Sequence, residues 1–339
     1  KWVRLHDQNH SGLHDKCVLP ENFVENMEKI IKKNQDTLKY KSPSGHGEII
    51  IKMPSGTSTK PSFSTLQASY PLKFLSPKTY TPYLAAIYIL TYGGGMVSGD
   101  KIFINIECHE NVNLMLLTQG STKIYKKRQI SDQFNNNNDN GLETTQNLNV
   151  IVQKNSFVLQ LPEPTTCFYD SEFVQHQKYS LENHTSSVII LDWFTSGRMS
   201  RGERWEFLKY ESGIDLFVNN KLIFRDVVLL KRKFDDYISR SSTPKEDILY
   251  GPKVTLLINN IVEEFDKIVV GKASKMPDLI WSSSGLDTKQ HNDGEISDLK
   301  GLVLKVAGVT TEIVKNFLIE VALKDLDELV GDNLFKRAL

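Results

Sequence analysis

The chain has 339 residues, with 41 basic and 41 acidic side chains and a formal net charge of zero. This balance argues against nucleic-acid binding, which needs a surplus of Lys and Arg for phosphate contacts, and no apolar run reaches the roughly 18 residues that a membrane-spanning helix requires. The three cysteines, Cys17, Cys108 and Cys167, are too few for a disulfide framework, so we expect a reducing, cytoplasmic environment.

Residues 1–45 differ in pattern from the rest of the chain. Apolar residues between Phe23 and Ile31 recur at helical spacing, and the segment Ser42 to Gly45 then interrupts the pattern. We therefore expect an N-terminal extension over residues 1–45 that is partly helical or disordered.

A β-rich core is predicted over residues 46–235. Short apolar or alternating segments follow one another without helical patterns between them, which favours a layered, barrel-like or solenoid β architecture. The near-continuous apolar run from Leu84 to Tyr92 is typical of a strand covered on both faces. The chain shows no fixed-length repeat, and the Asn-rich tract 135–141 predicts a disordered loop. Strands are expected at 48–52, 62–70, 84–92, 101–107, 112–118, 149–153, 157–161, 173–179, 188–193, 205–208, 214–218 and 222–230.

The last third of the chain, residues 250–339, mixes strand and helix patterns. Strands are expected at 254–258, 279–281 and 302–306, and helices at 259–269 and 310–323. The charged, Ser-rich segment 231–252 marks a boundary before them. The predicted fold class is therefore mainly β: an elongated, layered or solenoid-like β core followed by a smaller C-terminal α+β unit.

A triple glycine, Gly93-Gly94-Gly95, precedes Gly99 and Asp100. Gly94 and Gly99 have the spacing of a phosphate-binding P-loop, but Asp100 stands where a lysine would meet the phosphates, and its carboxylate would repel them. The glycines therefore predict a tight turn between strands, where the backbone comes close to another segment.

The residues from Asp192 to Trp205 form the densest polar cluster. Arg198, Arg201 and Arg204 lie between two tryptophans together with carboxylates and glycines. Arg and Trp are typical of protein–protein hot spots, while ion pairs between arginine and carboxylate would instead hold a long turn together. The sequence leaves both interpretations open.

Four possible metal ligands lie near the start of the chain: His6, His10, His14 and Cys17, at spacings of four, four and three residues. In a helix they would share one face and could bind nickel or zinc. Gly12 lies among them, which favours a disordered polar tail instead.

Catalytic motifs are missing from the sequence. We find no nucleophile elbow, zinc-protease motif or C-x-x-C pair. Cys108 and His109 are adjacent on a predicted strand, so their side chains face opposite ways. The chain is therefore expected not to be an enzyme.

Four blocks of sequence resemble the UreD (UreH) family of urease accessory proteins. They occur in that family's order and spacing within residues 47–230, and the resemblance continues more weakly to residue 339. The blocks are Gly93-Gly94-Gly95 with Gly99-Asp100, Leu117 to Tyr125, Leu161 to Pro164, and Asp192 to Trp205.

The resemblance implies a maturation factor and not a catalyst. Such a protein would act as a scaffold with the helical accessory protein UreF and the nickel-carrying GTPase UreG, in a complex on apo-urease that assists nickel insertion. No cofactor would be tightly bound, although Ni²⁺ could bind transiently on its way to urease.

Carried over to this chain, the resemblance points to Asp100, Thr122, Glu163 and Glu203 as oxygen donors that could line a nickel passage. The alternative is that these carboxylates pair with neighbouring Arg or Lys side chains and hold turns. Lys305 departs from the family pattern, because an arginine is expected at its position.

Two other functions are open at this stage. One is a stand-alone nickel metallochaperone that uses the His and Cys residues of the N-terminal segment. The other is a hydrolase on a β-solenoid, in which Glu163 and Glu203 would form a carboxylate pair at a fixed separation.

Overall fold

The computed structural model describes residues 43–128, 142–232, 253–259, 273–275, 278–286, 301–324, 326, 330 and 331. The chain divides into residues 1–42 and residues 43–339, and the described residues all belong to the second part. The Asn-rich tract and almost all of the N-terminal extension therefore lie outside the described residues, as does the predicted helix after Asn259.

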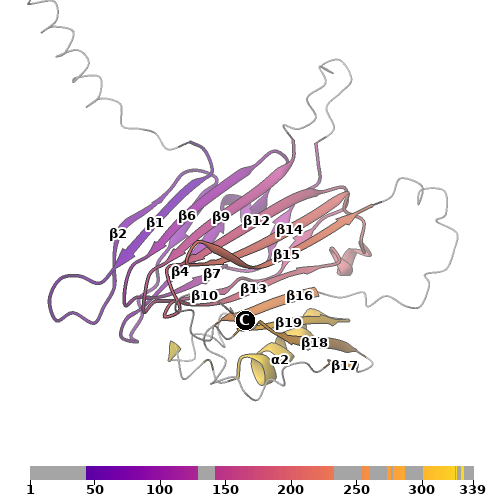
Figure 1. Ribbon diagram of the computed structural model, residues 1–339. Helices are drawn as coiled ribbons and strands as arrows, with labels where there is room; N and C mark the ends of the chain where they lie inside the picture. The colour runs from indigo at the N-terminus through magenta and orange to yellow at the C-terminus, as the bar shows by residue number, and fades with distance from the viewer. Residues whose placement is uncertain are drawn as a thin grey trace, which may run out of the picture. The chain divides into compact units, whose positions relative to one another are not determined.

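The described residues form two sheets stacked as layers (Figure 1). The first sheet has the strand order β15-β14-β12-β9-β6-β1-β2. Its strands are β1 (His46–Lys52), β2 (Ser62–Ala68), β6 (Lys101–Cys108), β9 (Thr144–Val152), β12 (Glu172–Leu181), β14 (Lys209–Val218) and β15 (Lys221–Lys231).

The second sheet follows the order β17-β18-β19-β16-β13-β10-β7-β4-β3. Three short strands, β5 (Gly95–Met96), β8 (Thr122–Ile124) and β11 (Thr165–Cys167), pair beside this path. The strands of the path are β3 (Leu72–Leu75), β4 (Leu84–Thr91), β7 (Asn113–Leu117), β10 (Phe157–Leu161), β13 (Ser187–Thr195), β16 (Lys253–Asn259), β17 (Ala273–Lys275), β18 (Leu279–Gly285) and β19 (Gly301–Gly308).

The chain winds as a parallel coil, and a hydrophobic cluster fills the space between the two sheets. Three times the chain passes from a long strand of the second sheet through a short strand to a long strand of the first: β4-β5-β6, β7-β8-β9 and β10-β11-β12. Equivalent strands pair in parallel, with Asn113 opposite both Leu84 and Phe157, and Phe157 opposite Ser187. The expected layered, solenoid-like core is confirmed.

The coil explains why the sequence has no fixed-length repeat. Successive register partners Leu84, Asn113, Phe157 and Ser187 are 29, 44 and 30 residues apart. The longest interval contains the Asn-rich tract 135–141. An insertion within one turn of the coil therefore hides a repeat that the parallel pairing shows.

The second sheet is covered on both faces. In β13, Val188, Ile190 and Phe194 belong to the hydrophobic cluster between the sheets. The alternate residues Ile189 and Leu191 belong to a second cluster, which packs against the C-terminal helical segment. In β4, Ala85 and Ile87 belong to the first cluster and Leu84 and Ala86 to the second, so the expected burial on both faces is confirmed for the first half of that apolar run.

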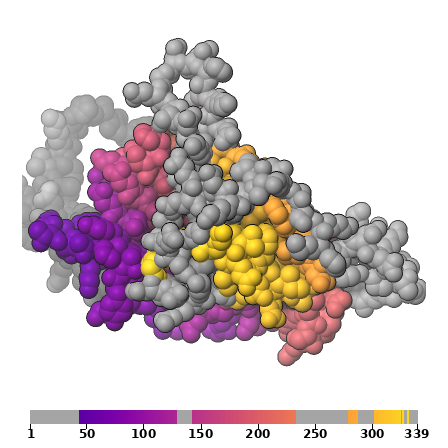
Figure 2. All heavy atoms as spheres, turned by 90° about the horizontal axis from the view of Figure 1, so that it is seen from below, coloured from indigo at the N-terminus to yellow at the C-terminus, as the bar shows by residue number. Residues whose placement is uncertain are grey.

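The C-terminal segment adds strands to the second sheet and a helix to its outer face. Strand β16 pairs antiparallel with β13, although the predicted boundary at 231–252 lies between them. The C-terminal strands therefore extend a sheet of the core and do not form a sheet of their own. The atoms of this segment, coloured yellow, lie at the surface in the view from below (Figure 2).

The helix predicted over 310–323 is present in a modified form. Helix α2 (Thr311–Phe317) continues as a π-helical turn, η6 (Leu318–Ala322). The Thr310 hydroxyl accepts a hydrogen bond from the backbone N–H of Ile313 and so caps the helix. Among the described residues, no helix has the length and apolar character needed to cross a lipid bilayer.

Some local predictions were wrong or incomplete. The segment 205–208 is not a strand, and β14 begins before the strand expected at 214–218. The short strands β5, β8 and β11 were missed because each has only two or three residues. A hairpin turn at Asn219-Asn220, with φ of 48° and 61°, joins the antiparallel strands β14 and β15.

Replacing a fully buried residue of the second sheet should cost much more stability than replacing an exposed residue of the first. Leu159→Ala in β10 should lower the free energy of unfolding by about 2–5 kcal/mol, because it leaves a cavity against the C-terminal helix. Val227 on β15 is 57% exposed, so Val227→Ala should change it by about 0.5 kcal/mol or less. Urea-induced unfolding measures both; equal losses would contradict the burial of the second sheet on both faces.

Candidate functional site

A group of polar side chains interrupts the apolar interior of the described part of the coil. On β12 the inward-facing residues include Gln175, Gln177 and Tyr179, all buried. Gln160 of β10 donates from Nε2 to Gln177 Oε1 at 2.5 Å. The Tyr179 hydroxyl donates to Gln160 Oε1 and, at 3.0 Å, to Gln177 Oε1. The interior therefore contains a hydrogen-bonded network where apolar packing would be expected.

The Asp192 carboxylate, on β13, is the charged group of this interior region. Ser212 donates from Oγ to Asp192 Oδ2 at 2.7 Å, and Gln175 donates from Nε2 to Oδ1 at 3.1 Å. Burial raises the pKa of the Asp192 carboxyl above its ordinary value, and the hydrogen bonds from Ser212 and Gln175 oppose this shift. The nearby charge of Asp226 raises the pKa further. No direct salt bridge to Asp192 is seen among the described residues.

Two other polar groups in this region are unsatisfied. Among the described residues, Gln177 Nε2 and the Tyr210 hydroxyl are buried without a hydrogen-bond partner of good geometry, although Asp192 and Ser212 lie near them. An unpaired buried donor costs free energy, so such groups usually meet water or an ion. Their position beside the Asp192 network indicates a place that a polar guest can occupy.

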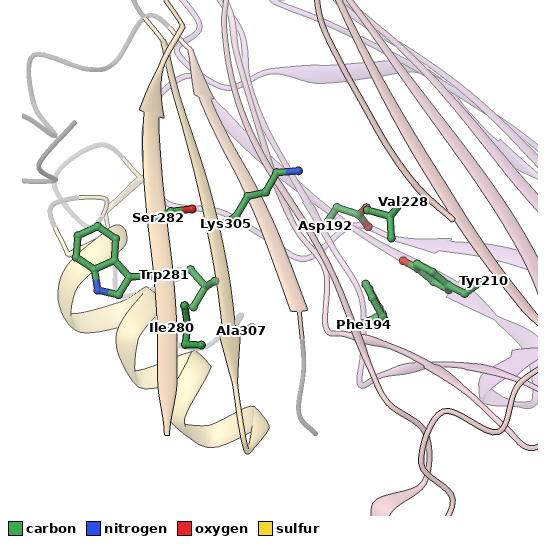
Figure 3. Close-up of a pocket in the computed structure, with 10 residues that line it drawn as sticks. Asp192, Phe194, Tyr210, Val228, Ile280, Trp281, Ser282, Lys305 and Ala307 are labelled. Atoms are coloured by element: carbon green, nitrogen blue, oxygen red, sulfur yellow. The ribbon is translucent and has the colours of Figure 1, made fainter. Parts of the chain in front are cut away.

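An outer cavity of about 240 Å³ lies between the end of the first sheet, at β14 and β15, and the second sheet with its C-terminal strands (Figure 3). Tyr210 and Val228 line it from the first sheet, and Ser282 and Lys305 line it from the C-terminal strands. The Trp281 ring turns away toward the helix, where its centroid lies 5.7 Å from that of Phe317.

An inner cavity of about 60 Å³ lies deeper in the coil. Its volume is enough for a few water molecules or a partly hydrated cation. Asp192 is among the residues that line both cavities. The polar residues of the inner cavity include Thr118, Thr122, Gln146, Gln160, Glu163 and Gln175.

An ion pair involving lysine lies at each cavity. Beside the outer cavity, Lys305 Nζ of β19 is 2.7 Å from Asp226 Oδ1. At the inner cavity, Lys315 Nζ of α2 is 2.8 Å from Glu163 Oε1. Position 305, where an arginine was expected, therefore has a lysine that forms an ion pair with Asp226.

The structure separates the four predicted passage residues into two groups. Thr122 and Glu163 line the inner cavity, whereas Asp100 and Glu203 are not among the residues that line either cavity. Asp100 Oδ2 accepts a hydrogen bond from the backbone N–H of Val97 at 2.8 Å and so closes its own turn.

Glu203 has a structural contact with Arg198. The Arg198 guanidinium donates two hydrogen bonds to Glu203, one from Nε at 2.7 Å, and lies 3.9 Å from the centroid of the Phe168 ring. These hydrogen bonds hold the pKa of the Glu203 carboxyl below its ordinary value. This geometry fits the interpretation in which an ion pair between arginine and carboxylate holds the long turn together.

The other residues of that cluster lie around the same turn. Arg201 and Arg204 are exposed, and Arg201 ends the short 3-10 helix η4 (Met199–Arg201). The Trp205 ring packs at the core edge, with its centroid 6.3 Å from that of Phe194. A role for Arg198, Arg201, Arg204 and Trp205 in partner binding stays a prediction.

The glycine segment forms the expected turn. Gly93 and Gly94 have φ of 80° and 70° in the 3-10 turn η1 (Tyr92–Gly94), and Gly99 has φ of 87°. At Gly95 a Cβ atom would lie 2.4 Å from the carbonyl oxygen of Lys123, so only glycine fits there. A role for these glycines in partner binding also stays a prediction.

The described residues offer no ready-made metal centre. They contain no group of three or more His, Cys, Asp or Glu side chains arranged to hold a metal ion. His6, His10, His14 and Cys17 lie outside the described residues. Cys108 is buried and His109 is partly exposed, and burial raises the pKa of the Cys108 thiol to about 12.

Sequence reasoning did not select Asp192, Gln175 or Gln177 as site residues. The pattern of β12 contains a sign of them, because Gln175 and Gln177 share the inward face with Phe173 and Tyr179. Uncharged polar residues at core positions of a strand often mark such an interior. Asp192 was noticed only as the start of the Arg-rich cluster.

Comparisons with known proteins agree on one family. The family model described as UreD urease accessory protein matches residues 46–333. Urease accessory protein 4 of Cryptococcus neoformans is 29% identical over 324 residues, which are 87% of this chain and 95% of that protein. Urease accessory protein D of Arabidopsis thaliana is 28% identical over 84% of this chain and 97% of its own length. An uncharacterized UreD-like protein of Schizosaccharomyces pombe is 30% identical over 74% of this chain and 85% of its own length.

Replacing Asp192 should change how stability depends on pH. Because its folded-state pKa is raised, the stability that the neutral carboxyl gives is present below its unfolded-state pKa of about 3.9 and is lost as the pH rises through the folded-state value. Asp192→Asn removes this loss, so the variant should gain stability relative to the wild type as the pH rises above about 4. Urea unfolding at several pH values measures the difference, and a difference that does not vary with pH would contradict the assignment.

Replacing Arg198 should change the pH dependence of the free energy of unfolding in the opposite direction. The lowered pKa of Glu203 gives stability that is present above its unfolded-state value of about 4.3 and lost as the pH falls through the folded-state value. Arg198→Ala should lower the free energy of unfolding at pH 7 by roughly 1–3 kcal/mol and weaken this acid dependence. The exposed Arg201→Ala variant is the control, and equal effects of the two changes would argue against the Arg198–Glu203 pair as the support of the turn.

Proposed function

The chain belongs to the UreD family of urease accessory proteins, and on that premise we propose that it is a non-catalytic scaffold for nickel insertion into urease. It forms a complex with a UreF-like accessory protein and a UreG-like GTPase on apo-urease. Within this complex Ni²⁺ is its transient cargo and passes through the interior of the β core.

The observation that supports this proposal best is the position of Asp192 on both cavities. From there, oxygen donors continue through Gln175 and Gln160 to Thr122 and Glu163. Carboxylate, amide and hydroxyl oxygens hold Ni²⁺ less firmly than imidazole or thiolate ligands. Such a lining supports passage of the ion and not its storage.

The glycine turn supports a division of labour with a GTPase partner. Gly94 and Gly99 have P-loop spacing, but the backbone there is a strand-to-strand turn, with Asp100 bonded to Val97. A carboxylate at that position repels phosphates. Nucleotide hydrolysis is therefore assigned to the partner.

The two carboxylates that the hydrolase alternative requires, Glu163 and Glu203, do not line the same cavity. Glu163 lines the inner cavity and bonds to Lys315, whereas Glu203 is not among the residues that line this cavity and bonds to Arg198. A glycosidase-like mechanism needs both carboxylates on the same substrate. The geometry supports an accessory role better.

The test is urease activation in cells that express urease, the UreF-like and UreG-like partners, and variants of this chain. Asp192→Asn and Glu163→Gln should still assemble with the partners, because both changes lie in the interior of the fold, but should lower urease activity about tenfold or more. Size-exclusion chromatography measures assembly, and nickel content of the purified urease measures delivery.

The matched control is Glu110→Gln. Glu110 also pairs with a lysine, Lys154 at 3.0 Å, but it is exposed and is not among the residues that line either cavity. This variant should activate urease as the wild type does. Full activation by both interior variants would refute passage through these cavities.

A further inference from the structure

Both cavities are associated with a lysine that pairs with a carboxylate. Lys305 Nζ lies 2.7 Å from Asp226 Oδ1, and Lys315 Nζ lies 2.8 Å from Glu163 Oε1. Resting on the function proposed above, we propose that Lys305 and Lys315 are built-in counter-ions that a divalent cation must displace to enter or leave the interior path.

At the outer cavity the lysine is placed for exchange. Figure 3 shows the Lys305 side chain extending from the C-terminal strands toward the side of the cavity that holds Asp192 and Tyr210. The Tyr210 hydroxyl, fully buried and without a hydrogen-bond partner of good geometry in the described part of the chain, is a further oxygen donor there. Two carboxylates and this hydroxyl thus lie around the region that the lysine ammonium approaches.

The two ion pairs differ in how readily they open. The Lys305 side chain is 50% exposed, and ion pairs of this kind contribute little because water competes with them. Lys315 is 24% exposed and Glu163 is 20% exposed, so this pair has less water to replace a lost contact. The outer lysine is therefore the easier one to displace.

Both lysines come from one packed segment. Lys305 is on β19 and Lys315 is on α2, and Gly308 lies at the end of β19. A Cβ atom at Gly308 would lie 2.7 Å from Val314 Cγ2, so the strand end and the helix pack closely. The C-terminal segment thus supplies the counter-charge for both cavities.

A lysine counter-ion also selects for charge. While the path is empty, the ammonium groups of Lys305 and Lys315 offset the charges of the Asp226 and Glu163 carboxylates, whose side chains are 18% and 20% exposed. A monovalent cation offers that carboxylate no more charge than the ammonium group, whereas a divalent cation offers twice as much. The exchange therefore favours divalent cargo such as Ni²⁺ over the more abundant K⁺.

The experiment compares Ni²⁺ binding by the full chain and its Lys305→Met and Lys315→Met variants. Removing the competing ammonium group should tighten binding by up to about fivefold at Lys305 and by more at the less exposed Lys315. Isothermal titration with a nickel salt in 150 mM KCl measures the affinity. Lys305→Arg keeps the charge and should bind as the wild type does.

The matched control is Lys154→Met. Lys154 pairs with Glu110 and is 46% exposed, but neither member of this pair is among the residues that line the two cavities, so its loss should not change Ni²⁺ affinity. Circular dichroism verifies the fold, and Lys305→Gln replaces Lys305→Met if the latter misfolds. Unchanged or weaker binding in the Lys305 and Lys315 variants would overturn the proposal.

The Ni²⁺-binding experiment and the urease-activation experiment test the two proposals separately. Tighter binding in the lysine variants, together with full urease activation by Asp192→Asn and Glu163→Gln, would keep the counter-ion exchange and reject passage. Unchanged binding, together with lost activation in those two variants, would reject the exchange and keep passage.

Discussion

Strands β4, β7, β10 and β13 lie in a sheet that is covered on both faces, by the first sheet on one side and by the C-terminal helix on the other. Their side chains must therefore be apolar in both directions, and any polar side chain there needs a partner from the protein. This constraint fixes the register of the coil, because a shift by one residue would exchange the two hydrophobic clusters. It also makes each polar residue of the interior informative.

Among the polar residues that break this constraint in the middle layer, Gln160 included, Asp192 carries an ionisable group. It faces the interior from β13, and the protein satisfies it with Ser212 and Gln175 instead of replacing it with an apolar residue. The break occurs where the first sheet ends and the C-terminal strands continue the second, so the space between the layers opens into a cavity. At the end of the coil, the two sheets therefore form the walls of the cavities, and Asp192 is among the residues that line both of them.

Patterns of hydrophobicity predicted the fold class, most long strands and the double burial of β4, because these depend on local periodicity. A solenoid-like core was expected, but the length of its repeat could not be read from the sequence, because an insertion interrupts the repeat and the short strands β5, β8 and β11 have no periodicity. Of the predicted passage residues, Thr122 and Glu163 line the inner cavity, while Asp100 and Glu203 have partners in their own turns. The contacts between residues distant in sequence, such as Glu163 with Lys315, follow only from tertiary structure.

We propose that a divalent cation travels through the interior of this β core past Asp192. The most direct measurement is anomalous diffraction at the nickel absorption edge from crystals of the chain in complex with its accessory partners, soaked in a nickel salt. An anomalous peak is expected within the outer or inner cavity beside the Asp192 carboxylate. Peaks confined to the outer surface, with both cavities free of nickel, would contradict it.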